Sequence, residues 1–467
     1  MSNKKILLDQ EKNLKANFGS VFRSSAIFFL PKKILTTISV SNYWEFKNNK
    51  KIGLLFSIRN IKGKLISREE KYFNSENVLN FEFKGKFNGS IEIEVFGNSN
   101  LRIPYAAIMA IYETKKSVSM VHSYARNHSL QEIEDSNCII KAKESCWTIK
   151  TNYENLAVFH NGHIPVKKQK AKLVLTKLDG KEKSYNFTIP NLKKYETYIF
   201  RINKIAKDFK SFFKNQNGFG SIYFNNNSSF TRLLLIWKDN SNFQVTHSNF
   251  DYSSIDTNDI RSKIGGEMII PNLKDVEAEF IVYPKFQKGK YNYLYHDEKE
   301  NFKNGFIKKI KKKTSRVIFK KIDSKTIPSR IVTGISGRFK NQKIPFECST
   351  GILHEKIPPK RFSWAIVSPK HKSLIYLNLS NVLKTNKNDR MIIIQLYSSN
   401  TKKVLKKKLR IPKDVKNSRI ELEKIFLNYE SFLNNQFGYI SVFSENTSLR
   451  IFTSISNNNS LTLEHGF

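Results

Sequence analysis

Short apolar runs, four to eight residues long and separated by turn residues, recur along the whole chain. Two of them lead into tight turns: residues 54–58 precede the turn 62–64, and residues 173–175 precede 179–181, where Asp-Gly is a strong hairpin signal. No segment sustains the 3.6-residue period of a long helix, and residues 207–213 and 429–433 predict only single helical turns. The pattern therefore predicts an all-β protein of antiparallel hairpins.

One block of this pattern is repeated. The two clearest copies are residues 219–224 with Arg232 and His247, and residues 437–443 with Arg450 and His465. In both, a glycine precedes the arginine by 12 residues, and the arginine precedes the histidine by 15. A third copy runs from Gly89 through Arg102 to His122, and a degenerate fourth leads from Lys343 to His354. Internal repetition of this kind predicts an array of similar structural units.

Each copy also opens with a similar strand. Residues 26–32, 280–285 and 364–370 each place an apolar run before Pro-Lys, and the second copy keeps only the aromatic start at Trp147. Proline ends a strand because it cannot donate to the ladder. About seven short strands in roughly 100 residues are typical of an antiparallel β-sandwich. The likeness to immunoglobulin-like sandwiches is one of architecture only, since the Cys…Trp…Cys spacing is absent.

The repeats define the expected domains. Successive copies of the histidine are 125, 107 and 111 residues apart. We therefore expect four tandem β-sandwich repeats at residues 20–129, 145–253, 277–355 and 358–467, of which the third is short and divergent. With 39% hydrophobic residues, the 467-residue chain has enough apolar side chains to give each unit a core.

Charge narrows the choice of partner. The chain carries 80 lysines and arginines against 40 acidic residues, a net charge of +40. An AT-rich codon bias towards lysine explains a part of this excess. The positive field that remains favours an anionic partner, namely an acidic glycan, a nucleic acid or a lipid headgroup surface.

Cysteine use and apolar run lengths bear on the cellular compartment. The three cysteines are Cys138, Cys146 and Cys348, and no two of them form a C-x-x-C pair, so a disulfide framework is not expected. Residues 103–112, an apolar run, are far shorter than the roughly 20 residues that span a bilayer. The first 20 residues lack the apolar region of a signal peptide. These features predict a cytoplasmic protein without a transmembrane segment.

The repeated histidines are the first candidate site. Four of the nine histidines occupy one repeat position: His122, His247, His354 and His465. A structural interpretation is that each ends the last strand of its unit and hydrogen-bonds a neighbouring loop. A functional interpretation needs the units to fold back so that the histidines converge, because a metal ion requires three or four ligands at about 2.0–2.2 Å.

A cation is also repeated. Arg102, Arg232, Lys343 and Arg450 occupy a matched position before the last hairpin. Such a residue either extends along the sheet surface or grips an anion, because a guanidinium binds carboxylate or phosphate through two parallel hydrogen bonds. A cation and a histidine on neighbouring strands of each unit would together form an anion-binding position.

The chain shows no local catalytic signature. It has no phosphate-binding loop, nucleophile elbow or H-E-x-x-H motif. We therefore expect a non-catalytic tandem-repeat binding or scaffold protein for an anionic polymer (acidic glycan or nucleic acid) or a protein partner. No cofactor is predicted. The alternatives are an enzyme with a histidine site between domains, with or without a metal ion, and a structural subunit of an assembly.

Overall fold

The computed structural model describes most of the chain between residues 23 and 466. The described residues are 23–48, 51–97, 103, 107–122, 126–128, 144–225, 232–253, 260–262, 266–286, 291–295, 298–302, 304–311, 316–321, 327–328, 331–351, 362–378, 388–415, 417–445 and 449–466.

The first unit consists of two antiparallel sheets, with strand orders β4-β3-β6-β1-β9 and β5-β2-β7-β8. Its elements are β1 (Arg23–Leu30), β2 (Leu35–Ser41), α2 (Tyr43–Asn48), β3 (Gly53–Asn60), β4 (Leu65–Tyr72), β5 (Val78–Lys84), β6 (Gly89–Phe96), β7 (Ile108–Glu113), β8 (Val118–His122) and β9 (Arg126–His128).

The second unit has the same plan, with strand orders β13-β12-β15-β10-β18 and β14-β11-β16-β17. Its elements are β10 (Glu144–Ile149), β11 (Glu154–His160), β12 (Gln169–Thr176), β13 (Glu182–Ile189), β14 (Thr197–Arg201), α4 (Ile202–Ile205), α5 (Phe209–Phe213), β15 (Gly218–Tyr223), β16 (Leu234–Lys238), β17 (Phe243–His247) and β18 (Asn249–Phe250).

The third unit pairs its strands as β20-β25-β22-β23 and β24-β21-β27-β28, and a separate two-stranded sheet joins β19 to β26. Its strands are β19 (Ile260–Ser262), β20 (Gly266–Ile269), β21 (Glu277–Val282), β22 (Tyr291–Tyr295), β23 (Glu298–Phe302), β24 (Phe306–Lys309), β25 (Arg316–Lys321), β26 (Ile327–Pro328), β27 (Val332–Arg338) and β28 (Phe346–Gly351).

The fourth unit has strand orders β29-β34-β31-β32 and β33-β30-β35-β36. Its elements are β29 (Ser363–Val367), β30 (Lys372–Asn378), β31 (Arg390–Tyr397), β32 (Val404–Ile411), β33 (Asn417–Glu421), α6 (Leu422–Ile425), α7 (Tyr429–Leu433), β34 (Gly438–Ser444), β35 (Arg450–Ser456) and β36 (Leu461–His465).

The same pairing order recurs in all four units of the described chain. Eight strands of each unit follow one order, counted from β1, β10, β20 and β29 and leaving out β26. The first pairs with the sixth, the sixth with the third and the third with the fourth, while the fifth, second, seventh and eighth form the other sheet. The expectation of an all-β chain made of tandem antiparallel sandwiches is confirmed. The short helices α5 and α7 lie at the two predicted helical turns.

In the third unit, the order of the strands differs from the order that the sequence repeat predicted. Residues 280–285 were matched to the opening strands of the other copies, but β21 pairs with β27 and β24 and so occupies the place of the second strand. The opening strand is β20, which pairs with β25. The third unit therefore begins before residue 277, because an apolar run before Pro-Lys marks a strand end without specifying which strand it is. The other proposed boundaries stay predictions.

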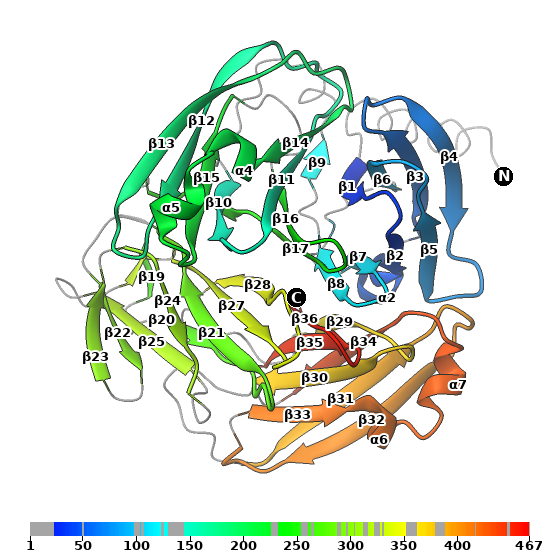
Figure 1. Ribbon diagram of the computed structural model, residues 1–467. Helices are drawn as coiled ribbons and strands as arrows, with labels where there is room; N and C mark the ends of the chain where they lie inside the picture. Colours follow the sequence, from blue (N-terminus) through cyan, green and yellow to red (C-terminus); the bar gives the residue numbers. More distant parts are fainter. Residues whose placement is uncertain are drawn as a thin grey trace, which may run out of the picture.

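The four units close into a ring (Figure 1). The eighth strand of the shared order lies at the centre in each unit, where β8 contacts β17 and β36, and β28 contacts the same two strands. Apolar side chains fill the seams between units: Tyr112 packs on Phe243 between the first and second, and Phe219 on Tyr283 between the second and third. Further clusters join the third unit to the fourth and the fourth to the first.

No helix in the described part of the chain combines the length and the apolarity that crossing a membrane requires.

Candidate functional site at the centre of the ring

Three of the four repeated histidines meet at the centre of the ring. His122, His247 and His465 are the final residues of β8, β17 and β36, the eighth strands of the shared order in the first, second and fourth units. The ring of His122 lies 4.6 Å from that of His247 and 4.9 Å from that of His465, measured between ring centroids. The strands converge because each is the inner edge of its own sheet. The functional interpretation required the units to fold back so that the histidines converge, and these three histidines do converge.

Hydrogen bonds orient two of the imidazoles. The Nδ1 atom of His247 lies 2.9 Å from the carbonyl oxygen of Ser248, and the Nδ1 atom of His465 lies 3.2 Å from that of Gly466. A carbonyl can only accept, so each Nδ1 carries the proton and donates it. In both residues the Nε2 atom is left with its lone pair.

His122 has the same protonation pattern for a different reason. A guanidinium nitrogen of Arg232 lies 3.3 Å from its Nε2 atom, and a guanidinium can only donate. Its Nδ1 atom therefore carries the proton and lies 3.1 Å from the Glu464 carboxylate. Burial, together with the Arg232 charge, holds the pKa of His122 well below its ordinary value. The imidazole is therefore neutral at physiological pH.

The other two imidazoles are neutral as well. Burial holds the pKa of His247 well below its ordinary value, and the charge of Arg232 acts in the same direction. Burial also lowers the pKa of His465 to about 4, although the neighbouring Glu464 carboxylate opposes this shift. The centre of the ring thus presents three uncharged imidazoles with Nε2 lone pairs.

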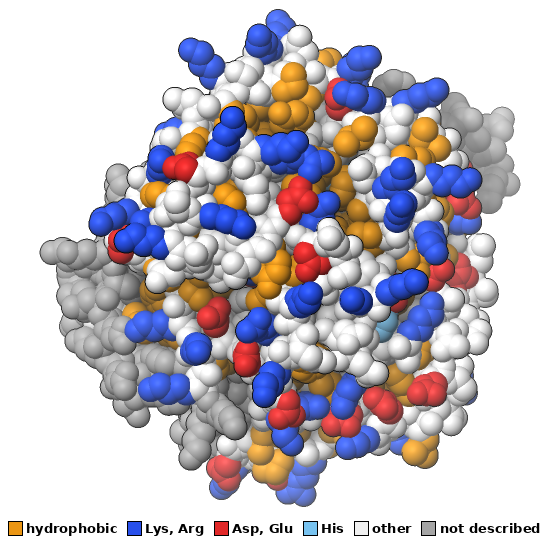
Figure 2. Space-filling model, in the orientation of Figure 1, with side chains coloured by type: hydrophobic (Ala, Val, Ile, Leu, Met, Phe, Trp, Pro, Cys, Tyr) orange, Lys and Arg blue, Asp and Glu red, His pale blue; other side chains and the backbone are white. Residues whose placement is uncertain are grey.

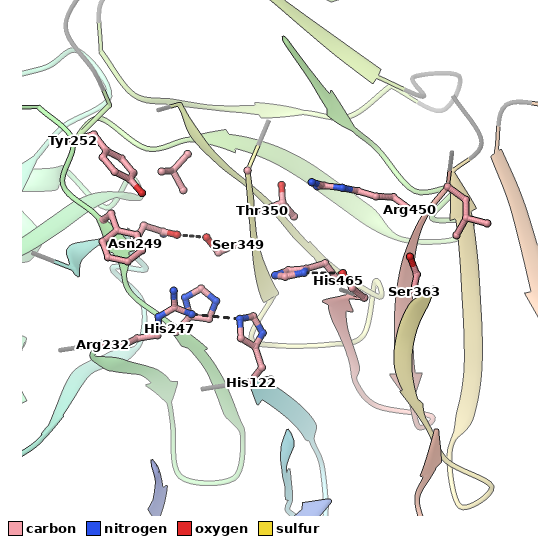
Figure 3. A pocket seen from close by; sticks show the side chains of 15 residues that line it. His122, Arg232, His247, Asn249, Tyr252, Ser349, Thr350, Ser363, Arg450 and His465 are labelled. Carbon is pink, nitrogen blue, oxygen red and sulfur yellow. Dashed lines mark hydrogen bonds between the residues drawn. The ribbon is translucent and has the colours of Figure 1, made fainter. Parts of the chain in front are cut away.

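Two arginines join the histidines in one pocket. A cavity of about 290 Å³ is lined by His122, His247, His465, Arg232 and Arg450, with Figure 3 showing how they lie around it. Arg232 precedes β16 by two residues and Arg450 begins β35, so the two guanidiniums come from the second and fourth units. No aspartate or glutamate is among the lining residues that the structure describes.

Neutral polar and aromatic groups complete the wall. They are Asn249, Phe250, Tyr252, Val332, Ser349, Thr350, Gly351, Ser363, Leu449 and Gly466. The hydroxyl of Ser349 contacts the amide oxygen of Asn249, which joins the third unit to the second. The rings of Phe250 and Tyr252 are 5.6 Å apart between centroids. The pocket therefore combines cationic donors, neutral hydrogen-bonding groups and an aromatic surface.

Lys343 does not belong to this site. The repeat aligned it with Arg232 and Arg450, but it is exposed in the turn between β27 and β28, after the seventh strand of its unit instead of before it. The expectation of an equivalent position was wrong, because the similarity of residues 343–346 to 102–105 is confined to a short Ile-Pro-aromatic run. Arg102 and His354 lie outside the described residues.

Sequence reasoning missed several members of the site. Glu464 is 3% exposed and sits between two imidazoles, and Tyr252, Ser349 and Thr350 line the pocket from other units. Glu464 had a signal: the residue before the repeated histidine is Val121 in the first copy and a threonine in the second, so an acid there is exceptional. The others carry no local mark, because their role comes only from the meeting of units.

Comparisons with known proteins add little. The sequence matches no protein-family model and no curated protein. Among solved structures, the FN1–FN3 domains of chicken CNTN1 cover 70% of this chain and 95% of that chain, at 10% identity and a TM-score of 0.11. A Salmonella alpha-2-macroglobulin reacted with methylamine covers 94% of this chain and 32% of that one, at 9% identity and a TM-score of 0.12. This chain thus spans about a third of the macroglobulin structure, and at these TM-scores neither likeness carries an argument.

Proposed function

We propose that this protein binds an anionic ligand in the central pocket and that binding, without catalysis, is its function. The observation that carries the proposal is the meeting of Arg232 and Arg450, from two different units, in one pocket whose described lining contains no acidic side chain. Two guanidiniums that line one pocket match a carboxylate, sulfate or phosphate group, because each offers paired N–H donors to paired oxygens.

The rest of the pocket suits a ligand that carries hydroxyl groups. Ser349, Thr350 and Asn249 offer neutral donors and acceptors, and Tyr252 offers a ring together with a hydroxyl. A volume of about 290 Å³ holds a small molecule or one end of a chain. These properties favour an acidic sugar residue, either free or at the end of an acidic glycan.

Net charge assists binding without giving it specificity. Lysine and arginine side chains are spread over the whole face shown in Figure 2, with acidic side chains between them. A field of +40 raises the local concentration of any anion. Selection among anions would therefore rest on the pocket that the two arginines line.

Charge-removing variants separate pocket binding from bulk charge. We expect Arg232→Gln with Arg450→Gln to weaken the binding of glucuronate and of glucose 6-phosphate by at least about 10-fold, as removal of a charge-assisted pair should. The matched control is Lys406→Gln with Lys408→Gln, which removes the same charge from exposed positions on β32. Isothermal titration with each sugar, and with neutral glucose, gives the comparison. Equal losses in the two double variants would refute the proposal, since only bulk charge would matter.

One observation favours an enzyme as a second candidate. The Glu464 carboxylate beside Nδ1 of His122 resembles the arrangement that orients a general base. However, the Nε2 lone pair that would accept a substrate proton already faces Arg232. Binding is therefore the stronger candidate.

The structural-subunit alternative stays a prediction. The observation in its favour is β4, an edge strand of the first unit on which Leu65, Ile66 and Tyr72 are exposed. An exposed edge strand can pair with a strand of another chain.

A further inference from the structure

The carboxylate of Glu464 is buried beside two neutral imidazoles. Among the described residues, no lysine or arginine forms an ion pair with it. Its neighbours are the Nδ1 atom of His122 at 3.1 Å, the backbone N–H of His465 at 3.2 Å and the thiol of Cys348 at 3.9 Å. A buried carboxylate is costly unless a positive charge compensates it. A cation bound directly to the Glu464 oxygen would supply that compensation.

The geometry around Glu464 suits a metal ion. One ligand atom from each of His122, Glu464 and His465 lies within 4.8 Å of the other two. The Glu464 oxygen is 3.1 Å from Nδ1 of His122 and 3.8 Å from Nε2 of His465. Metal–ligand bonds of about 2.1 Å in a tetrahedron place neighbouring ligand atoms about 3.4 Å apart. The two separations from the Glu464 oxygen lie on both sides of this value, and the two imidazole nitrogens lie within 4.8 Å of each other.

The outer contacts of these residues have the form found around metal ligands. A histidine that binds a metal through one nitrogen usually donates the other N–H to a carbonyl or carboxylate. His465 does so, because its Nδ1 faces the carbonyl of Gly466 and its Nε2 is turned to Glu464. The backbone N–H of His465 donates to the same carboxylate oxygen and holds it in place.

We infer that His122 Nδ1, the Glu464 carboxylate and His465 Nε2 form a zinc site that joins the first unit to the fourth. Two imidazoles and one carboxylate are a ligand set typical of Zn²⁺, whereas Ca²⁺ and Mg²⁺ prefer oxygen ligands throughout. Three protein ligands leave a fourth position for water or a ligand group. The inference does not depend on the proposed anion binding.

Zinc binding has a defined consequence for Arg232. A neutral imidazole has one N–H, so metal at Nδ1 of His122 moves the proton to Nε2. That N–H would then face the guanidinium of Arg232, which now donates to Nε2 at 3.3 Å. The guanidinium must therefore move away from His122 when zinc binds. Because Arg232 lines the pocket, an anion bound there would accept its hydrogen bonds.

Metal content tests the inference directly. Full-length protein purified without a histidine tag and stripped with a chelator is dialysed against Zn²⁺, and bound metal is measured by elemental analysis. We expect one zinc per chain, and Glu464→Gln or His465→Gln to weaken zinc binding by at least about 100-fold, more than the loss of an outer-contact residue. The control is His247→Gln: its ring is 4.6 Å from His122, but His247 is not one of the three clustered ligands. This variant should keep its zinc.

Two results would overturn the inference. One is wild-type protein that takes up less than about one tenth of an equivalent of Zn²⁺ under conditions where proteins with three-ligand sites are saturated. The other is His247→Gln losing as much zinc as His465→Gln, with circular dichroism showing that both are folded. Co²⁺ substitution of the wild type gives a reading that needs no variant. The visible bands of four-coordinate Co²⁺ support the site, and a six-coordinate spectrum contradicts it.

Discussion

The hydroxyl of Ser117 in the first unit accepts the backbone N–H of Phe243 in the second unit at 3.0 Å. Two residues further on, the hydroxyl of Ser119 accepts the N–H of Val245 at 2.9 Å. Ser119 lies on β8 and Ser117 immediately precedes that strand, and both donors lie on β17, the inner edge strand of its sheet. Alternate residues of one segment thus satisfy the open edge of the next strand.

The same arrangement continues round the ring. Ser460 immediately precedes β36, and its hydroxyl accepts the N–H of Val118 at 2.7 Å. In turn, the side-chain oxygen of Gln342 accepts the N–H of Leu461 at 2.9 Å. An edge strand exposes unpaired N–H groups that would otherwise recruit other chains. Here the side chains of neighbouring units cover those edges, which accounts for a closed ring instead of an extended array.

Removing seam hydroxyls should weaken the ring. Ser117→Ala with Ser119→Ala leaves two buried N–H groups on β17 without acceptors, at a cost of about 1–3 kcal/mol each. We expect a clear fall in the urea midpoint of unfolding, followed by fluorescence. Ser67→Ala, on the exposed face of β4, is the control and should leave the midpoint unchanged. An unchanged midpoint in the double variant would show that the seam does not depend on these hydroxyls.

Lys150 and Glu347 form a buried ion pair between the second and third units, and the effects of replacing them on stability should be strongly coupled. Lys150 is 2% exposed; its Nζ atom lies 3.5 Å from Glu347, 3.0 Å from the carbonyl of Pro345 and 3.5 Å from the ring centroid of Trp237. Lys150→Met leaves the Glu347 carboxylate buried without its partner and should cost about 3–5 kcal/mol.

The double variant Lys150→Met with Glu347→Gln tests whether the cost comes from the pair. It should be more stable than Lys150→Met alone, because no uncompensated charge remains. A double-mutant cycle on urea unfolding gives the coupling. Additive effects of the two substitutions would contradict it.

Stability should fall in acid partly through His160. Burial lowers the pKa of this histidine to about 3, and its Nδ1 atom lies 2.9 Å from the hydroxyl of Thr197. Below about pH 6.5 the unfolded chain binds a proton at His160 that the folded chain does not bind until about pH 3. The free energy of unfolding therefore decreases as the pH falls through this window, by up to about 1.4 kcal/mol per pH unit for this group.

The variant His160→Gln isolates that contribution. Unfolding in urea at a series of pH values should give a shallower acid decline for His160→Gln than for the wild type. His163→Gln, at the half-buried neighbouring histidine, should follow the wild type. If His160→Gln declines as steeply as the wild type, the buried neutral state of His160 does not govern the acid response.

The repeat allowed much of each unit to be predicted. The hairpins at residues 54–64 and 173–181 are β3–β4 and β12–β13, since alternation and turn chemistry act between residues close in the chain. The third unit was aligned wrongly because its Pro-Lys step follows β21, a second strand, whereas in the first and fourth units it follows the opening strand. A strand's partners depend on residues far along the chain, which an isolated apolar run does not identify.

The sequence by itself determined the fold class and the strand ends at His122, His247 and His465, because these depend on local periodicity and on comparing copies. Only the tertiary structure decided that His122, His247 and His465 meet, that Arg232 faces His122, and that Lys343 lies elsewhere. Whether four sandwiches close or extend depends on their edges and seams. Those contacts join residues more than 100 positions apart, such as Ser117 with Phe243, and leave no pattern within either segment.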